Sequence, residues 1–209
     1  NDVTAEELRQ QPGVEEGTNE AEASADSVLP QTQQEALNKT LDWAFAEPDP
    51  KHPIRTRAVV IMHNGKVVAE RYAKGITPTT ALMGWSMTKS VTNAMIGLLV
   101  KDGKLDVNKP APITEWANDN RKVITVDNLL RMSSGLKFGE VYNGISDATK
   151  MLFSVAGAGQ YALQSPTEAS PATKWYYSSG TSNIVQEIIR RQCKTHADYL
   201  NFPQQRLFQ

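Results

Sequence analysis

The chain has 209 residues, of which 40% are hydrophobic and 22% are charged, values that fit a soluble globular protein. Its net charge of -1 gives no overall field that would favour nucleic acid or an anionic membrane. No run of 18 apolar residues is present, so the sequence predicts no membrane span. The single cysteine, Cys193, excludes an intrachain disulfide, and we expect it to be a buried structural thiol.

Residues 1–31 are rich in Glu, Ala, Gln and Ser and contain almost no large apolar side chains. Such a segment buries too little surface to offset its ordering entropy, which predicts a disordered or extended acidic arm. The chain begins with Asn1 and lacks an apolar signal core, as a removed signal peptide or a trimmed chain would explain. We expect a periplasmic or secreted protein, with a cytoplasmic one as the alternative.

Residues 32–85 are predicted to form a helix followed by a β-hairpin. Thr32 and Glu35 have capping-box spacing, and the helix should end before Pro48. Asn64-Gly65 lies between two β-type runs, which is a strong signal for a tight hairpin turn.

Residues 86–209 read as a helical region. The first helix starts at Ser86 and is apolar on most sides, so it should be buried. Further helices are expected over 125–132, 147–153, 180–191 and 196–200, the last ending before Pro203. With two strands and about six helices, the chain needs further strands to complete a sheet, because an isolated hairpin is marginal in water.

Two Ser-x-x-Lys patterns occur, and such a pattern is weak by itself. In the first, Ser86 opens the apolar helix, so its hydroxyl and the Lys89 amine share one helix face. The helix N-terminus supplies N–H groups suited to an oxyanion, and apolar surroundings would favour a neutral, basic Lys89. On this local pattern alone, a nucleophile and a simple cap with a solvated lysine are about equally favoured. The second pattern, Ser134 to Lys137, sits in a turn and serves as an internal control.

The loop at residues 175–180 favours the catalytic interpretation. Tyr177 lies there between two helical stretches, and a phenol beside a lysine can relay a proton to and from a serine hydroxyl. Because Tyr176 is adjacent, chemistry alone leaves the register open between the two tyrosines. An aromatic loop that only packs is the alternative.

At these positions the chain resembles the β-lactamase and penicillin-binding-protein superfamily. It is most similar to class C β-lactamase-like esterases and to 6-aminohexanoate-dimer (nylon oligomer) hydrolases. The likeness extends over about residues 55–209. It rests on four ordered segments: GWSMTKS at 84–90, LVKDGKLD at 99–106, LLRMSSGL at 129–136 and KWYYSSG at 174–180.

The resemblance implies a role for individual residues. Ser86 would be the acylated nucleophile, Lys89 would assist its deprotonation, and Tyr177 would act as general base and acid. The Ser86 backbone N–H would form half of an oxyanion hole. Ser179, Trp85 and Gly180 are the predicted substrate-binding residues. Ser179 stands where many relatives have Asn, which disfavours a β-lactamase.

The resemblance also implies an α+β fold of the β-lactamase/transpeptidase type, an antiparallel sheet flanked by helices plus an all-helical domain. Its C-terminal strands and its third motif, Lys/His/Trp-x-Gly, would follow residue 209. We therefore expect the C-terminal remainder of the same protein as a partner, and no cofactor, metal or nucleic acid. The scattered His52, His63 and His196 show no metal-ligand spacing.

The function expected from the sequence is a serine hydrolase (carboxylesterase or amidase) that cleaves a small ester or amide through an acyl-enzyme. A β-lactamase, a D-Ala-D-Ala peptidase and a non-catalytic ligand-binding relative are the alternatives.

Overall fold

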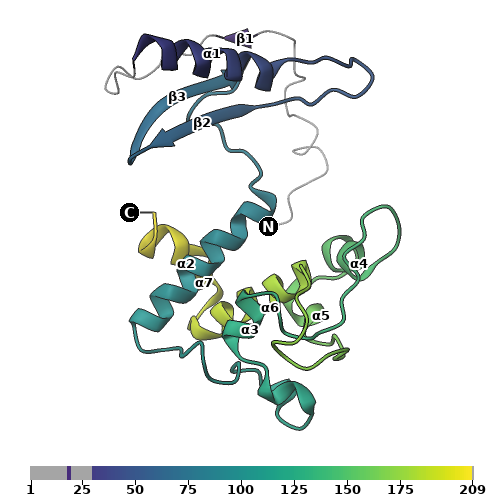
Figure 1. Cartoon of the computed structure of the whole chain (residues 1–209). Helices are drawn as coiled ribbons and strands as arrows, with labels where there is room; N and C mark the ends of the chain where they lie inside the picture. The colour runs from purple at the N-terminus through teal and green to yellow at the C-terminus, as the bar shows by residue number, and fades with distance from the viewer. Residues whose placement is uncertain (1–17, 20–29, 209) are drawn as a thin grey trace. The chain divides into compact units, whose positions relative to one another are not determined.

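The computed structural model describes residues 18–19 and 30–208 of the chain. The chain divides into two compact units, residues 1–83 and residues 84–209. The first unit combines a helix with a small sheet, and the second is helical (Figure 1). Among the described residues, no helix is long and apolar enough to cross a membrane.

Most of the predicted acidic arm lies outside the described residues. Within it, Thr18–Asn19 form strand β1, which pairs with a later strand. The domain boundaries expected after residues 31 and 85 stay predictions.

The predicted hairpin is confirmed. Strands β2 (Ala58–His63) and β3 (Lys66–Ala73) pair antiparallel, and β1 pairs with the other edge of β3, giving the order β1-β3-β2. Asn64 and Gly65 link the strands with φ of 49° and 76°. Two successive positive φ angles are typical of a type I′ turn, whose twist matches that of the strands.

Helix α1 (Gln31–Phe45) packs against the same hairpin. Leu41 is buried, and the carboxylate of Asp42 accepts a hydrogen bond of 2.6 Å from the Arg71 guanidinium on β3. The predicted capping box is wrong, because the helix starts at Gln31 with Pro30 as its N-cap. The Pro30 φ of -50° already suits a helix entry, so Thr32 lies inside the first turn.

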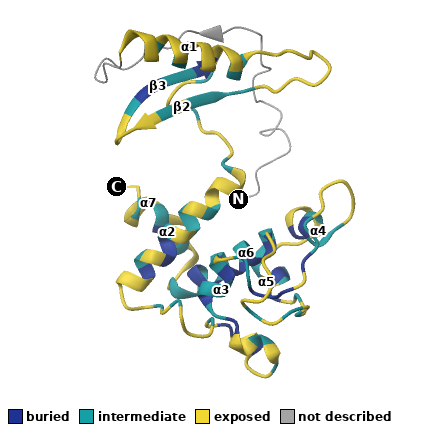
Figure 2. Cartoon of the chain, viewed as in Figure 1, coloured by how far each residue is buried: buried dark blue, intermediate teal, exposed yellow. Residues whose placement is uncertain are grey.

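The second unit consists of short helices around one hydrophobic core. In chain order these are η1 (Trp85–Met87), α2 (Thr88–Lys101), η2 (Thr114–Trp116), η3 (Asn120–Val123), α3 (Val126–Leu130), α4 (Asp147–Phe153), α5 (Ala158–Ala162), α6 (Ser179–Gln192) and α7 (His196–Arg206). Helix α6 contacts α2, α3, α4, α5 and α7 and so lies at the centre of the unit (Figures 1 and 2). Its apolar stripe is fully buried and comprises Ile184, Val185, Ile188 and Ile189.

Local signals explain several of the helix starts. Thr125 caps α3 and Ser146 caps α4, each through a complete capping box. Helix α2 is less enclosed than predicted within this chain, because Met95, Ile96 and Leu99 are buried while Val100 is exposed.

Helix α7 continues past the point at which the sequence predicts its end. Pro203 lies inside the helix although proline removes one helical hydrogen bond. Tertiary contacts hold both sides of it: Phe202 is buried, and Arg206 makes two hydrogen bonds of 3.0 Å with Asp102 at the end of α2. These contacts offset the local cost of the proline.

Candidate active site

The candidate nucleophile lies in a tight turn that leads into α2. Ser86 is the middle residue of η1, and α2 begins only at Thr88. The prediction that Ser86 opens the α-helix is therefore wrong, because Ser86 lies in a 3₁₀ turn that comes directly before the helix. The Thr88 hydroxyl donates a hydrogen bond of 2.6 Å to the Trp85 carbonyl oxygen, which holds the turn closed. Trp85 has a φ of 43°, a left-handed conformation that costs a side-chain-bearing residue about 1–2 kcal/mol.

Ser86 and Lys89 meet as the helical spacing predicts. The Lys89 ammonium donates a hydrogen bond of 3.1 Å to Ser86 Oγ. Ser86 is exposed and Lys89 is half-buried, so the described residues enclose the lysine less than the sequence led us to expect. The Ser86 side chain is therefore accessible to solvent in the described part of the chain.

Tyr177 completes the cluster from the loop before α6. The Lys89 nitrogen lies 4.7 Å from the centroid of the Tyr177 ring. A hydrogen bond with Ser86 and then one with Lys89 lower the pKa of the Tyr177 phenol. Three residues from two distant segments of the chain are therefore in mutual contact, and the contacts with Ser86 and Lys89 make the phenol easier to ionise than an ordinary tyrosine.

The start of α6 fixes this loop. Ser178 is the N-cap, and its hydroxyl accepts a hydrogen bond of 3.1 Å from the Thr181 N–H. Ser179, the first helical residue, makes two hydrogen bonds with Glu140: its N–H donates to Oε2 at 2.9 Å and its hydroxyl donates to Oε1 at 2.5 Å. The Tyr142 hydroxyl donates to the same carboxylate at 2.6 Å.

Glu140 and Tyr142 are site residues that the sequence did not point to. They precede Ser179 by 39 and 37 residues, and no spacing rule connects such distant positions. The sequence offers only a glutamate two residues before a tyrosine, and this pattern is too common to be specific.

The three predicted substrate-binding residues have different surroundings. Trp85 is 66% exposed beside the nucleophile and stays a predicted substrate contact. The Ser179 side chain is held by Glu140. Gly180 is buried, and a Cβ atom there would lie 2.5 Å from the Phe138 ring. Close packing therefore accounts for this glycine without a substrate.

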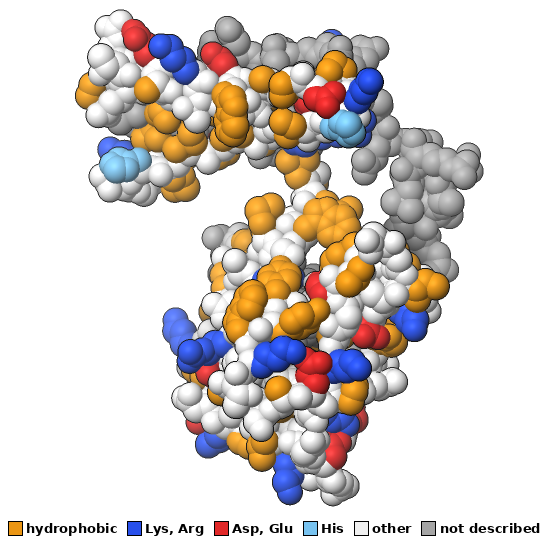
Figure 3. Space-filling model, turned by 45° about the vertical axis from the view of Figure 1, so that its right-hand side comes forward, with side chains coloured by type: hydrophobic (Ala, Val, Ile, Leu, Met, Phe, Trp, Pro, Cys, Tyr) orange, Lys and Arg blue, Asp and Glu red, His pale blue; other side chains and the backbone are white. Residues whose placement is uncertain are grey.

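Hydrophobic side chains are common on the surface of the second unit (Figure 3). Near the nucleophile in sequence, Trp85 and Met87 are exposed, and Trp175 is exposed in the tyrosine loop. Such exposed apolar side chains are suited to contact an apolar part of a substrate or of another polypeptide.

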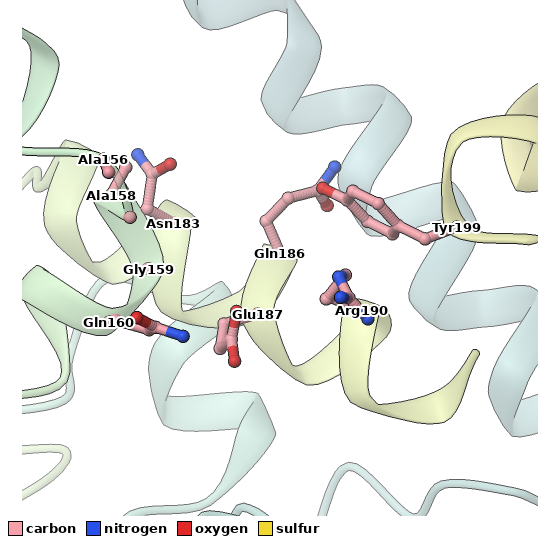
Figure 4. A pocket seen from close by; sticks show the side chains of 10 residues that line it. Ala156, Ala158, Gly159, Gln160, Asn183, Gln186, Glu187, Arg190 and Tyr199 are labelled. Carbon is pink, nitrogen blue, oxygen red and sulfur yellow. The ribbon is translucent and has the colours of Figure 1, made fainter. Parts of the chain in front are cut away.

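A cavity of about 390 Å³ lies elsewhere in this unit (Figure 4). Its lining combines amide, charged and phenolic side chains of α5, α6 and α7, among them Gln160, Asn183, Glu187, Arg190 and Tyr199. Ser86, Lys89 and Tyr177 do not line it, so it is separate from the candidate active site.

Among the described residues, no cluster of His, Cys, Asp and Glu could hold a metal ion. His52 pairs with the exposed Asp49 at 2.8 Å. Cys193 is half-buried rather than fully buried, its thiol donates to the Ile189 carbonyl at 3.5 Å, and desolvation raises its pKa.

Comparisons with known proteins point to one family and one fold. The family model described as "Beta-lactamase" matches residues 33–209. A Bacillus anthracis structure assigned as a 6-aminohexanoate-dimer hydrolase shares 24% identity with a TM-score of 0.50, over 66% of this chain and 42% of that chain. A Bacteroides dorei DSM 17855 structure assigned as a beta-lactamase shares 19% identity with a TM-score of 0.56, over 77% of this chain and 45% of that chain. A search of curated proteins found no match.

These likenesses confirm the predicted α+β, β-lactamase-like fold. The chain spans less than half the length of either solved structure.

Proposed function

The chain belongs to the beta-lactamase family, and we propose that it supplies the nucleophile of a serine hydrolase that cleaves a small ester or amide. The observation that carries the proposal is the contact of Lys89 with both Ser86 and Tyr177, at 3.1 Å to the hydroxyl and 4.7 Å to the ring centroid. A serine in contact with two proton-carrying groups is the arrangement that an activated nucleophile requires.

In the proposed first half-reaction, Tyr177 as the phenolate takes the proton of Ser86 Oγ. Its lowered pKa supports this role, because a general base works best when its pKa approaches the operating pH. The Lys89 ammonium, which already faces Ser86 Oγ, stabilises the negative charge during the transfer. Ser86 Oγ then bonds to the substrate carbonyl carbon. The carbonyl oxygen of the substrate becomes an oxyanion, which accepts a hydrogen bond from the Ser86 backbone N–H.

Collapse of this tetrahedral intermediate breaks the bond to the leaving alcohol or amine, which takes the proton from Tyr177. The acyl group remains on Ser86. In the second half-reaction, Tyr177 takes a proton from water, and the hydroxide attacks the acyl carbon. Ser86 leaves with that proton, so both groups return to their starting state.

Among the possible substrates, we favour an ester or a linear amide over a β-lactam, and a β-lactam over a D-Ala-D-Ala peptide. The Ser179 hydroxyl is already bonded to Glu140, which leaves it less able to take the substrate contact that an asparagine makes in relatives of the resembled family. The name of the Bacillus anthracis structure makes a 6-aminohexanoate dimer a natural compound to include.

The test is covalent labelling of the purified full chain with a fluorophosphonate, followed by peptide mass spectrometry. We expect one adduct, on Ser86, which is lost in Ser86→Ala and kept in the control Ser134→Ala. A panel of p-nitrophenyl esters, a β-lactam and a short linear amide then ranks the substrates.

An unlabelled Ser86 together with tight binding of one of these compounds would favour a non-catalytic ligand-binding relative. Turnover that persists in Ser86→Ala would place the nucleophile elsewhere and reject the proposal.

A further inference from the structure

Glu140 is a half-buried carboxylate whose two oxygens are both engaged near the tyrosine loop. It accepts three hydrogen bonds: one from the Ser179 N–H, one from the Ser179 hydroxyl and one from the Tyr142 hydroxyl. A carboxylate at the first N–H of a helix also complements the positive end of the helix dipole. Glu140 therefore binds the start of α6 more firmly than a hydroxyl cap alone.

The contacts of Glu140 lie on both sides of Tyr177 in the sequence. On one side, the Glu140 backbone N–H donates a long hydrogen bond of 3.4 Å to the Tyr176 hydroxyl. On the other, its carboxylate holds Ser179, two residues after Tyr177. Glu140 thus contacts the side chain before Tyr177 and the backbone after it, while the Tyr176 backbone N–H donates a hydrogen bond of 2.8 Å to the Met132 carbonyl oxygen.

The segment around Glu140 is itself anchored. The Gly139 N–H donates a hydrogen bond of 2.8 Å to Asp147 Oδ2, and its carbonyl accepts one of 3.0 Å from the Ala148 N–H in α4. Phe138 is buried against Gly180, where no side chain would fit. The residues before Glu140 are therefore anchored to the core, so Glu140 has a defined position and its hydrogen bonds can restrain the loop that carries Tyr177.

We propose that Glu140 is a positioning residue that holds Tyr177 against Ser86 and Lys89. The inference rests on the proposed function, since it assigns to Glu140 the orientation of the general base. Glu140 touches no reacting atom in this scheme and acts through its two hydrogen bonds with Ser179, which lies two residues after Tyr177.

The charges around Tyr177 define a second, measurable effect. Lys89 faces it from α2, while Glu140 and Tyr142 lie on the neighbouring segment. The negative charge of Glu140 raises the pKa of Tyr177, against the larger lowering from Ser86 and Lys89. Removal of this charge should let Tyr177 ionise at a lower pH.

The experiment measures the fluorophosphonate labelling rate of Ser86 in the full chain as a function of pH, for wild type, Glu140→Gln and Glu140→Asp. Glu140→Gln keeps the size and removes the charge. We expect about a 10- to 100-fold slower rate, since a small displacement of a catalytic group costs up to about 10², and a rise in rate that begins at lower pH. Glu140→Asp keeps the charge but is shorter, so the rate should fall while the pH of the rise stays that of wild type.

Glu168→Gln is the matched control. Glu168 pairs with Lys174 at 2.5 Å in the same loop region but makes no contact with Ser179, so its loss should change neither rate nor pH profile. Equal rates and profiles for Glu140→Gln and wild type would overturn the inference, whereas a wild-type chain that does not label would contradict the proposed function instead. If Glu140→Gln does not fold, Glu140→Asp decides: a rate equal to wild type would overturn the inference.

Discussion

The chain carries the pattern Ser-x-x-Lys twice, and the two copies have different structures. At residues 86–89 the backbone is helical, so Lys89 reaches back to Ser86 over 3.1 Å. At residues 134–137, Gly135 has a φ of 74° and breaks any helical path. There the buried Ser134 hydroxyl accepts a hydrogen bond of 3.3 Å from the Leu136 N–H, while Lys137 is exposed.

The difference lies in the residues between serine and lysine. Met87 and Thr88 keep helical backbone angles and place the two side chains on one face. Gly135 instead turns the chain, so that Ser134 satisfies the backbone and has a structural role. A short catalytic pattern is therefore informative only together with the conformation that its middle residues adopt.

The largest expected effect is a difference in kcat/KM between substitutions of Lys89 and of Lys137, the lysines of the two copies. Lys89→Ala should lower kcat/KM on the best ester by about 10²–10⁴, because in the proposed mechanism Lys89 assists proton transfer at Ser86. Lys137→Ala should leave kcat/KM unchanged, since the Lys137 side chain is exposed and the hydrogen bond of this residue, to the Pro166 carbonyl oxygen, comes from its backbone N–H. Steady-state kinetics of both variants test this, and equal losses would contradict the distinction between the two copies.

A smaller effect tests the turn of the second copy. Gly135→Ala adds a Cβ atom that meets the Ala169 carbonyl oxygen, at a residue with positive φ. Overpacking and the left-handed backbone together should lower the free energy of unfolding by about 3 kcal/mol or more. Gly103→Ala is the control, because its φ of 68° is similar but nothing lies within 4 Å, so it should cost about 1 kcal/mol. Denaturant unfolding measures both; a Gly135→Ala cost no greater than that of Gly103→Ala would mean that the turn is not tightly packed.

The smallest effect concerns the stability of the helical unit that holds both copies. The Arg191 guanidinium on α6 makes hydrogen bonds of 2.6 and 2.8 Å with Glu115 and lowers the pKa of that carboxyl from 4.5 to about 2. Because the folded-state pKa is depressed, the contribution is present above pH 4.5 and is lost as the pH falls toward 2.

Glu115→Gln should therefore destabilise the chain by about 1 kcal/mol or less at pH 7, since the pair is partly exposed. The difference from wild type should shrink between pH 4.5 and pH 2. Thermal unfolding of both proteins across this range measures it. A difference that does not change with pH would exclude the ion pair as its source.

Much of the fold follows from local signals. Asn64-Gly65 specifies the hairpin turn, Thr125 specifies the start of α3, and the spacing of Ser86 and Lys89 predicts their contact. Each of these depends on residues within a few positions of one another, where backbone geometry leaves few alternatives.

Features set by distant contacts were missed. The bonds of Glu140 to Ser179 join segments 39 residues apart, and the continuation of α7 through Pro203 depends on Asp102 at the end of α2. The N-cap at Pro30 was missed for a local reason, because Thr32 offered a stronger pattern two residues later. Periodicity describes only residues that lie within a few positions of one another, so it cannot predict contacts between segments that are far apart in the sequence.

The left-handed Trp85 places a backbone cost in the turn that carries the candidate nucleophile. Glycine or asparagine at this position would adopt the same φ at little cost, so the bulky side chain is a poor choice for folding alone. Selection for a more stable protein would tend to replace Trp85, whereas the predicted contact of its exposed indole with substrate would favour keeping it. Variants that gain thermal stability at residue 85 should therefore be sought among those that lose activity, a trade that is common near catalytic residues.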